Sequence, residues 1–525
     1  MSKKVCIVGA GPSGLVTIKE LLNQDISITC FEKQDSIGGA FNVPEKGGQS
    51  YDSLKLTVSN YFMAYSDFMP DTSEDRRYWS ATEYKQYLLD YVDHNGLSDH
   101  IRTSHEVINA SIEGNKVVVT VSNEQGEFNE VYDHFIICSG SNSIPKIPTW
   151  KNQHLFQGKL SHSVEYKNAD EYKDKKVVCI GIGESGADIV HEISQVASSC
   201  KVLIRDYPNV IARWVNGYTN DAYTTYFFYA AKTMGINSYM KFQAWHSLKF
   251  DKNLSKEGRL LQQWVYNRDF YMGKFFTKSD VFIEDVTEGR TQLIKDEPES
   301  FTASGIRTRK GEEIEADLVI CNTGYRTDFG NFSFGEDFVN PRKLFKNMIS
   351  PEHGTLISLI GWARPTQGGL PACSEMQARY LAQLITGKKE LPSKKALHRS
   401  IEKDRVRNER MFRDSSNITS LISYHDFMID LAKLIGCKPK KVYWNDLKLS
   451  RKLLFGSHLS AFYRISNSVT KESAVRTIKS LPVAYTNKRN FIILFFVLLF
   501  NPLSRLSNLF MARPNKVSME GSANE

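Results

Sequence analysis

The chain has 525 residues, of which 41% are apolar and 24% charged, and its net charge is +8. This composition is that of a globular protein with roughly two to four domains, and it excludes a disordered chain. No dense Lys/Arg run stands out, so we expect no nucleic-acid partner, and the modest positive charge suits an anionic lipid surface instead.

No signal-peptide segment precedes the first expected strand at residues 4–8, so we expect the body of the protein to face the cytosol. The cysteines are scattered without a Cys-x-x-Cys pair, and several lie in apolar, strand-like runs. We predict that they are buried free thiols in a reducing compartment, with a redox disulfide or a zinc site as the alternatives. The sequence offers no other cluster of metal ligands, and no metal is expected.

The first expected element is a buried parallel strand over residues 4–8, followed by a glycine turn and a helix over residues 15–22. In such a turn the first glycine permits the bend, the second lets the backbone approach a pyrophosphate, and the third lets the helix pack on the strand. The phosphates bind at the helix N-terminus, where free N–H groups favour anions. We therefore predict a dinucleotide site made by Gly9, Ala10, Gly11, Pro12, Ser13 and Gly14.

A second expected strand, over residues 26–31, ends at an acidic residue that is placed to accept hydrogen bonds from both ribose hydroxyls. A carboxylate there would repel a 2′-phosphate, so NADP is not expected. A Gly-Gly pair follows, as in the FAD site of flavoproteins that bind two dinucleotides; a glycine turn without a ligand is the alternative. We predict FAD, with contacts from Glu32, Lys33, Gly39, Ala40 and Phe41.

Residues 156–166 read Phe-x-Gly-x-x-x-His-x-x-x-Tyr, with Phe156, Gly158, His162 and Tyr166 as the fixed positions. A lone histidine in a linker is more often structural than catalytic. We expect His162 to support a hinge between two domains, and a contact with NADP is the alternative.

A second buried-strand run at residues 176–180 leads into another glycine turn and a helix over residues 187–196. The next strand, residues 202–204, ends at Arg205 where the first site has its acid, and an arginine there favours the 2′-phosphate of NADPH. The neighbouring Asp206 weakens the argument for NADPH over NADH. Arg213 could contribute a second cation. The Glu184 side chain must point away from the phosphates, because it would repel them. The predicted NADPH contacts are Gly181, Gly183, Ser185, Gly186 and Arg205.

Residues 207–280 show no nucleotide-fold pattern, and 15 of the 59 residues from Trp214 to Met272 are aromatic. Core packing, a membrane-interface belt and the lining of a substrate passage each explain such a stretch. The sheet is expected to resume with a strand at residues 281–283.

Near the end, residues 491–500 are an unbroken apolar run that cannot alone cross the ~30 Å of hydrocarbon in a bilayer. Apolar residues recur at helical spacing up to Met511. We expect a monotopic membrane anchor over residues 491–511, with a buried core helix or a tilted single span that buries Arg505 as the alternatives.

Taken together, these motifs resemble the flavin-containing monooxygenase family. Residues 156–166 are similar to its linker signature, and Lys167 follows Tyr166 where the Baeyer–Villiger group has Trp-Pro, which favours the N- and S-oxygenating branch. Residues 38–41 resemble its Gly-Gly-x-Trp motif, and residues 375–379 resemble part of its returning FAD domain. Its Ala-Thr-Gly-Tyr segment, expected beside NADPH, is matched by Asn322, Thr323, Gly324 and Tyr325.

The resemblance implies an α/β fold with two Rossmann-like domains for FAD and NADPH, a helical insertion and a C-terminal membrane-associating helical segment. The FAD domain would comprise residues 1–155 and 326–450, and the NADPH domain residues 156–325 with the insertion at about 207–280. A C-terminal region, residues 451–525, would attach the enzyme to a membrane, the endoplasmic reticulum in a eukaryote. Its assembly, including a homodimer, stays open.

The implied reaction begins when NADPH reduces FAD and O2 adds to the flavin as a C4a-hydroperoxide. Bound NADP⁺ shields it from water, and a soft nitrogen or sulfur atom of a small molecule then takes the distal oxygen. An NADPH oxidase, a Baeyer–Villiger enzyme, a reductase that passes electrons to a partner and a non-enzymatic flavin sensor are the alternatives.

One position departs from the family. The family usually has an asparagine near the flavin and NADP, in the loop ahead of residues 66–68, and Thr57 takes its place here. A hydroxyl keeps one hydrogen bond but lacks the second group of an amide. We therefore expect leakage to hydrogen peroxide, and we take Thr57, Ser59 and Asn60 as the candidate catalytic residues.

Overall fold

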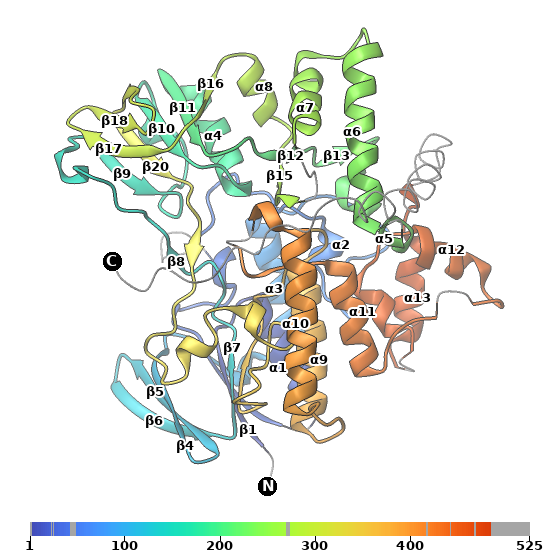
Figure 1. The fold of residues 1–525 in the computed structure, drawn as a ribbon. Helices are drawn as coiled ribbons and strands as arrows, with labels where there is room; N and C mark the ends of the chain where they lie inside the picture. Colours follow the sequence, from blue (N-terminus) through green and yellow to red (C-terminus); the bar gives the residue numbers. More distant parts are fainter. Residues whose placement is uncertain are drawn as a thin grey trace.

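The computed structural model describes residues 3–22, 24, 26–42, 49–230, 232–268, 273–415, 418–440, 443–466 and 469–484. Its two halves are each built around a five-stranded parallel sheet, and they lie one above the other in Figure 1. The chain crosses between them twice. The two crossing strands, β8 (Ile144–Pro145) and β21 (Tyr325–Arg326), pair antiparallel with each other.

The first sheet has the strand order β22-β7-β1-β2-β3 and is parallel throughout. Helices α1 (Pro12–Leu22) and α9 (Leu370–Ile385) pack together on one face. The antiparallel strands β4, β5 and β6 cover the other face. Because both faces are buried, the strands are continuous apolar runs. Their bounds are Lys4–Val8 (β1), Ser27–Phe31 (β2), Ile101–Arg102 (β3), Glu106–Glu113 (β4), Lys116–Asn123 (β5), Gly126–Tyr132 (β6), His134–Ile137 (β7) and Ile357–Leu359 (β22).

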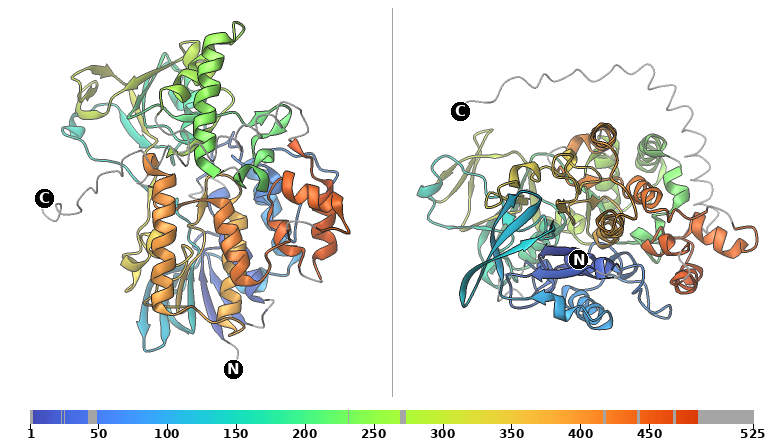
Figure 2. Two further views of the ribbon diagram at one scale, coloured as in Figure 1. Left: turned by 45° about the vertical axis from the view of Figure 1, so that its right-hand side comes forward. Right: turned by 90° about the horizontal axis from the view of Figure 1, so that it is seen from below.

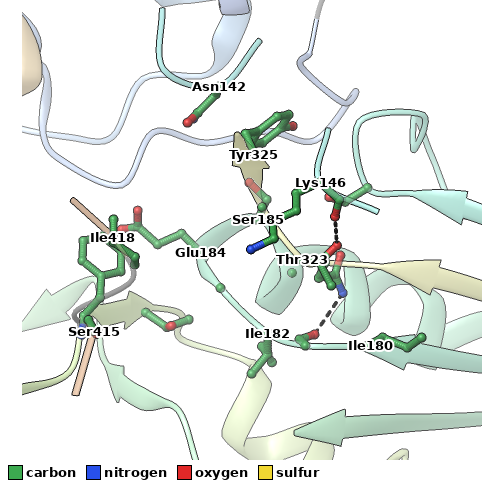
Figure 3. A pocket seen from close by; sticks show the side chains of 18 of the residues that line it. Asn142, Lys146, Ile180, Ile182, Glu184, Ser185, Thr323, Tyr325, Ser415 and Ile418 are labelled. Carbon is green, nitrogen blue, oxygen red and sulfur yellow. Dashed lines mark hydrogen bonds between the residues drawn. The ribbon is translucent and has the colours of Figure 1, made fainter. Parts of the chain in front are cut away.

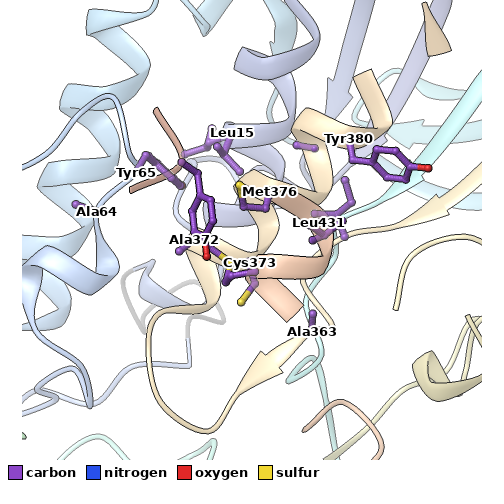
Figure 4. Close-up of a cluster of buried hydrophobic side chains, with 14 of the residues drawn as sticks. Leu15, Ala64, Tyr65, Ala363, Ala372, Cys373, Met376, Tyr380 and Leu431 are labelled. Carbon is purple, nitrogen blue, oxygen red and sulfur yellow. The ribbon is translucent and has the colours of Figure 1, made fainter. Parts of the chain in front are cut away.

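The core of this half joins segments that are far apart in the sequence. The cluster contains Leu15 of α1, Tyr65 of the loop after α2 and Met376 of α9 (Figure 4). Leu431 of α11 (Tyr424–Ile435) packs against them. The remaining helices of this half are α2 (Asn60–Met63), α3 (Ala81–His94) and α10 (Lys394–Met411).

The second sheet has the order β16-β11-β10-β20-β9 and is also parallel throughout. Helices α4 (Glu184–Val196) and α8 (Phe282–Thr287) pack on one face, and the antiparallel strands β17, β18 and β19 cover the other. The strand bounds are Lys159–His162 (β9), Lys176–Ile180 (β10), Ser199–Ile204 (β11), Thr291–Lys295 (β16), Pro298–Thr302 (β17), Gly305–Thr308 (β18), Glu313–Glu315 (β19) and Leu318–Cys321 (β20).

The strand predicted at residues 281–283 is wrong, because helix α8 begins there. The Ser279 hydroxyl accepts a hydrogen bond from the Phe282 amide at 3.2 Å, which satisfies a free N–H of the first helical turn. The strand lies just before it, as β15 (Phe276–Lys278). A three-residue apolar run does not distinguish a strand from the start of a helix.

The insertion carries helices α6 (Lys232–Phe250) and α7 (Lys256–Tyr266), which stand side by side beyond the second sheet (Figures 1 and 2). Its aromatic residues divide into two groups. Trp264 is buried in the second core, whereas Phe242 and Phe250 are more than half exposed. The other elements are β12 (Asn209–Ile211), β13 (Trp214–Val215), β14 (Tyr218–Thr219) and α5 (Tyr226–Ala230).

The C-terminal region packs against the first half through α12 (Leu447–Phe455) and α13 (Lys471–Ser480), whose buried residues belong to the first core. The predicted membrane segment, residues 491–511, lies outside the described residues. Within the described part of the chain, no helix has both the length and the apolar character needed to cross a membrane. All eight cysteines are buried and free, as predicted.

Candidate cofactor and active site

The first glycine turn has the geometry that a dinucleotide needs. Gly9 has φ +102°, and a Cβ atom on Gly14 would lie 1.9 Å from the Gly9 carbonyl oxygen, so no side chain fits there. Gly11 faces Gly39, whose φ is +57°. Helix α1 then begins at Pro12, a residue that suits the first position of a helix because its missing N–H would be unpaired there.

Glu32 lies directly behind this turn. Its buried carboxylate accepts hydrogen bonds from the backbone amides of Ala10 at 2.7 Å and Gln34 at 3.0 Å. Each carboxylate oxygen has two lone pairs, so acceptor capacity remains for the ribose hydroxyls of a dinucleotide. The neighbouring Lys33 side chain is exposed. The turn and the acid together fit FAD, and the carboxylate disfavours a 2′-phosphate here.

The second glycine turn is open on the side that would face a ligand. Gly181 has φ +83°, and a Cβ atom on Gly183 would meet nothing within 4 Å. Gly186 packs against Asn322, whose amide nitrogen donates to the Gly181 carbonyl at 3.3 Å. The amide oxygen of Asn322 is buried and has no partner among the described residues. Thr323 donates to the Lys146 carbonyl and fixes the neighbouring segment. This cradle fits the pyrophosphate of NADPH.

The end of β11 carries a cationic cluster that the sequence did not reveal. Asp206, which follows Arg205, is held by Lys295 at 3.1 Å and by Lys274 at 3.4 Å. Burial alone would raise the pKa of the Asp206 carboxyl, but the two lysines outweigh it and keep the pKa below its usual value. Because the Asp206 carboxylate is paired with these two lysines, it no longer weakens the argument for NADPH that rests on Arg205. Both lysines lie far along the chain, and no local signal points to them.

Arg213, which the sequence left open as a second cation for the phosphate, is not placed for that role. Its guanidinium is buried and forms an ion pair with Asp188 at 2.8 Å. The Tyr51 hydroxyl donates to the same carboxylate at 3.0 Å. Arg213 therefore stabilises the packing of α4 and does not line the cleft.

Glu184, the first residue of α4, points away from the phosphate cradle. Its carboxylate forms an ion pair with Arg364 at 3.1 Å, and the Arg364 guanidinium lies 4.4 Å from the centre of the Phe275 ring. Arg364 begins the short strand β23 (Arg364–Pro365) of the first half, whereas Phe275 belongs to the insertion. Three parts of the chain thus meet beside the second turn.

A cleft of about 1690 Å³ lies between the two halves. It contains the second glycine turn and the Asn322–Tyr325 segment, and it extends to Phe41 and Thr57 in the first half. Figure 3 shows Ser185 and Glu184 on one wall, with Lys146 and Tyr325 beside them. Of the predicted FAD contacts, Ala40 and Phe41 line this cleft, whereas the first glycine turn and Glu32 are not among its lining residues. Further lining residues that matter below are Ala40, Lys274, Phe275, Trp362 and Arg364.

The three candidate catalytic residues occupy different environments. Thr57 is half-buried and lines the cleft. Asn60 is fully buried, and its amide binds Glu74 at 3.0 Å and the Asp75 carbonyl at 3.1 Å. The Ser59 hydroxyl is buried and has no partner among the described residues. Asn60 therefore cannot replace the amide that Thr57 lacks, because its own amide holds the adjacent loop.

The fixed positions of the linker signature all make close contacts within the protein. The His162 ring lies 2.9 Å from the Gly324 carbonyl and ends strand β9, and burial lowers the pKa of its imidazole. Phe156 packs on Phe301, and a Cβ atom on Gly158 would lie 2.3 Å from the Asp317 carbonyl. Tyr166 donates to Glu192 at 2.5 Å. The segment includes β9, the edge strand of the second sheet.

Residues 2–483 match the family model described as FMO-like, flavin-binding monooxygenase-like. The chain belongs to this family. It is accordingly an oxidoreductase that uses FAD and NADPH, and the two glycine turns with their partners Glu32 and Asn322 fit these cofactors.

Among characterised relatives, the 4-hydroxybenzoate brominase (decarboxylating) of Pseudoalteromonas luteoviolacea is 33% identical over 89% of this chain and 90% of its own length. The enzyme of the same name from Marinomonas mediterranea is 34% identical, with 89% and 90% covered. Flavin-containing monooxygenase 5 of Rattus norvegicus is 29% identical, with 91% of each chain covered.

Solved structures share the fold. The S-allyl-L-cysteine S-oxygenase of Allium sativum superposes with a TM-score of 0.60 over 95% of this chain and 99% of its own, at 18% identity. An open structure of cyclohexanone monooxygenase gives 0.60 over 83% and 98%, at 14% identity. This chain therefore shares its fold with these two oxygenases.

Proposed function

We propose that this protein is an NADPH- and O2-dependent flavin enzyme that oxidises a halide and transfers it to an electron-rich hydroxylated aromatic acid. The observation that carries the proposal is the similarity to two bacterial 4-hydroxybenzoate brominases over nine-tenths of the chain, at higher identity than to flavin-containing monooxygenase 5 of Rattus norvegicus. Thr57, which replaces the usual asparagine of the N- and S-oxygenating branch, is consistent with a different nucleophile.

The proposed reaction balances. One aromatic C–H, one halide ion, O2, NADPH and two protons give one aromatic C–halogen bond, NADP⁺ and two waters. When the halogen replaces a carboxylate, CO2 leaves in place of the aromatic proton and a third proton is consumed. Bound FAD supplies the electron transfer from NADPH and the activation of O2.

The residues of the chain bind and orient the reactants. The Glu32 carboxylate and the first glycine turn hold FAD, and the second turn with Arg205 holds NADPH. One-third of the Arg364 side chain is exposed, it lines the cleft, and its guanidinium is stacked near Phe275. A cation beside an aromatic wall suits an aromatic carboxylate.

N- or S-oxygenation of a small molecule is the second candidate. It is favoured by the linker ending Tyr166-Lys167, which differs from the Trp-Pro of the Baeyer–Villiger group. Halides, sulfides and amines are all soft nucleophiles, so the same cofactor arrangement serves each of them. The Baeyer–Villiger, oxidase and reductase alternatives have no comparable support.

The deciding experiment supplies the purified FAD-loaded protein with NADPH and O2 under four conditions. These are 4-hydroxybenzoate with bromide, 4-hydroxybenzoate without halide, a thioether, and a tertiary amine. Brominated phenols in the first condition alone support the halogenase. Sulfoxide or N-oxide without any brominated product would reject it in favour of the second candidate.

Association with a membrane through residues 491–511 is a further proposal, as is a body that faces the cytosol. It rests on the apolar run at residues 491–500 and the preceding Lys488-Arg489. The two brominases come from bacteria, so an endoplasmic reticulum location applies only to a eukaryotic source. A homodimer likewise stays a proposal.

A further inference from the structure

The insertion holds the Thr57 loop from two sides. The Lys278 ammonium donates to the Thr57 carbonyl at 2.6 Å, and the Asp221 carboxylate accepts from the Ser59 amide at 2.5 Å. Lys278 is 5% exposed and Asp221 is 2% exposed. Both residues belong to the insertion, whereas Thr57 and Ser59 belong to the first half.

Asp221 is itself rigidly fixed. Its other oxygen accepts from the Thr219 hydroxyl at 2.7 Å and from Arg76 at 3.1 Å, and Arg76 also donates to the Ser457 hydroxyl at 2.7 Å. Burial alone would raise the pKa of Asp221, but Arg76, Lys278 and the Ser59 amide outweigh it, and the pKa is lowered. The carboxylate is therefore ionised at neutral pH and is a firm anchor for the loop.

Burying the Lys278 ammonium costs free energy, and the hydrogen bond to Thr57 offsets only part of that cost. Within the described part of the chain its ammonium forms no ion pair, and burial lowers its pKa. A buried cation that lacks a directly contacting carboxylate costs stability, so a methionine of similar size would be no worse for folding. A role other than stability would explain this residue.

The direction of the side chain indicates that role. Successive residues of a strand point to opposite sides. Thr277 of β15 lines the cleft, as does Phe275 just before the strand. Lys278 instead points into the protein and donates to the backbone carbonyl of Thr57. Thr57 itself lines the cleft. Lys278 thus touches the loop from behind and does not face the ligand space.

We infer that Lys278 and Asp221 are positioning residues that fix the Thr57 loop against the FAD and NADPH region, so that the insertion controls how tightly oxygen chemistry is coupled to NADPH use. This inference rests on the flavin monooxygenase family and holds whichever nucleophile is the substrate. A loosened Thr57 would admit water to the reacting flavin, and electrons from NADPH would then be lost as hydrogen peroxide.

The test compares Lys278→Met, Lys278→Arg and Asp221→Asn with Lys252→Met, an exposed lysine of the same insertion. Three quantities are measured on the FAD-loaded proteins: the visible absorption spectrum of the oxidised flavin, the hydrogen peroxide formed per NADPH consumed, and the thermal unfolding midpoint. The flavin spectrum and the affinity for FAD are readouts that require no turnover.

For Lys278→Met we expect a shifted flavin spectrum and a rise of about tenfold in peroxide per NADPH, on the scale of effects from misplacing an active-site group, with an almost unchanged unfolding midpoint. Lys278→Arg should retain part of the coupling, and Lys252→Met should match the parent. An unchanged spectrum and peroxide ratio in both Lys278→Met and Asp221→Asn would overturn the inference, whatever happens to the unfolding midpoint. If Lys278→Met does not fold, the same two readouts on Lys278→Arg and Asp221→Asn decide it.

Discussion

Glu184 and Arg364 form an ion pair at 3.1 Å across the cleft, and this contact joins the N-terminus of α4 to the first half of the molecule. An acidic residue at this helix end would otherwise face the pyrophosphate of NADPH. Arg364 therefore pairs with a carboxylate that would otherwise repel the phosphates of the cofactor.

Arg364→Ala should raise the KM for NADPH about fivefold, which corresponds to about 1 kcal/mol for a partly exposed charge pair. Steady-state kinetics at several ionic strengths provide the measurement. The double variant Arg364→Ala/Glu184→Gln should recover most of the loss, because it also removes the unpaired carboxylate. Equal KM values for the single and double variants would show that the pair has no such role.

Cofactor choice should depend on the cations at the end of β11. Arg205→Ala should lower the preference for NADPH over NADH about 10- to 100-fold, as expected for the loss of a charge-assisted contact. Lys295→Ala should lower it less, by freeing Asp206, which then repels the 2′-phosphate. The ratio of kcat/KM for the two nucleotides measures both effects. Asp206→Asn in the Lys295→Ala background should restore the preference.

Substitution by alanine should affect a different cofactor at each of two glycines. Gly14→Ala places a Cβ atom 1.9 Å from the Gly9 carbonyl oxygen, so the purified protein should contain little FAD. Gly183→Ala meets nothing within 4 Å and should leave the flavin content intact while weakening NADPH. Flavin absorbance per protein and the KM for NADPH distinguish the two. A fully flavinated Gly14→Ala protein would contradict the assignment of the first turn.

Arg464 holds the C-terminal region to the first half and should matter for stability. Its guanidinium binds Glu375 at 2.9 Å and Glu20, and all three side chains are buried. Arg464→Met removes the guanidinium from both carboxylates and leaves Glu20 with Lys19 at 3.1 Å and Glu375 with the Ser66 amide at 2.8 Å. It should cost about 3–5 kcal/mol of unfolding free energy, the scale for breaking a buried pair. Denaturant unfolding provides the measurement, and Arg476→Met, an exposed arginine of α13, is the matched control.

The same cluster of side chains predicts that the protein loses stability at acid pH. Burial alone would raise the pKa of Glu20, but Arg464 and Lys19 outweigh it and lower the pKa to about 2. A carboxyl whose pKa is depressed by folding stabilises the protein above its unfolded pKa, about 4.3 for glutamate. That contribution should disappear as the pH falls from about 4.3 towards 2. Stability measured across this range should fall more steeply in the parent than in Arg464→Met.

Both cofactor turns could be predicted from the sequence, because each is encoded locally by an apolar strand, three glycines and a helix. The contacts that complete the site could not. Lys278 reaches Thr57 over more than 200 residues, and Lys274 and Lys295 reach Asp206 through the folded insertion and sheet. Arg213 lies close to β11 in the sequence and was considered for the phosphate for that reason, but its closeness did not reveal its pairing with Asp188.

The parallel pairing of β22 with β7 has a consequence for the order of folding. The second sheet uses only residues 159–295 and 318–321, so it can form while the rest of the chain is still being synthesised. The first sheet lacks an edge strand until residues 357–359 are available. The first half, which we expect to bind FAD, is therefore the last to mature, although its glycine turn is the first to be made. A premature stop just before residue 357 would release a chain with a complete second sheet and an open first sheet.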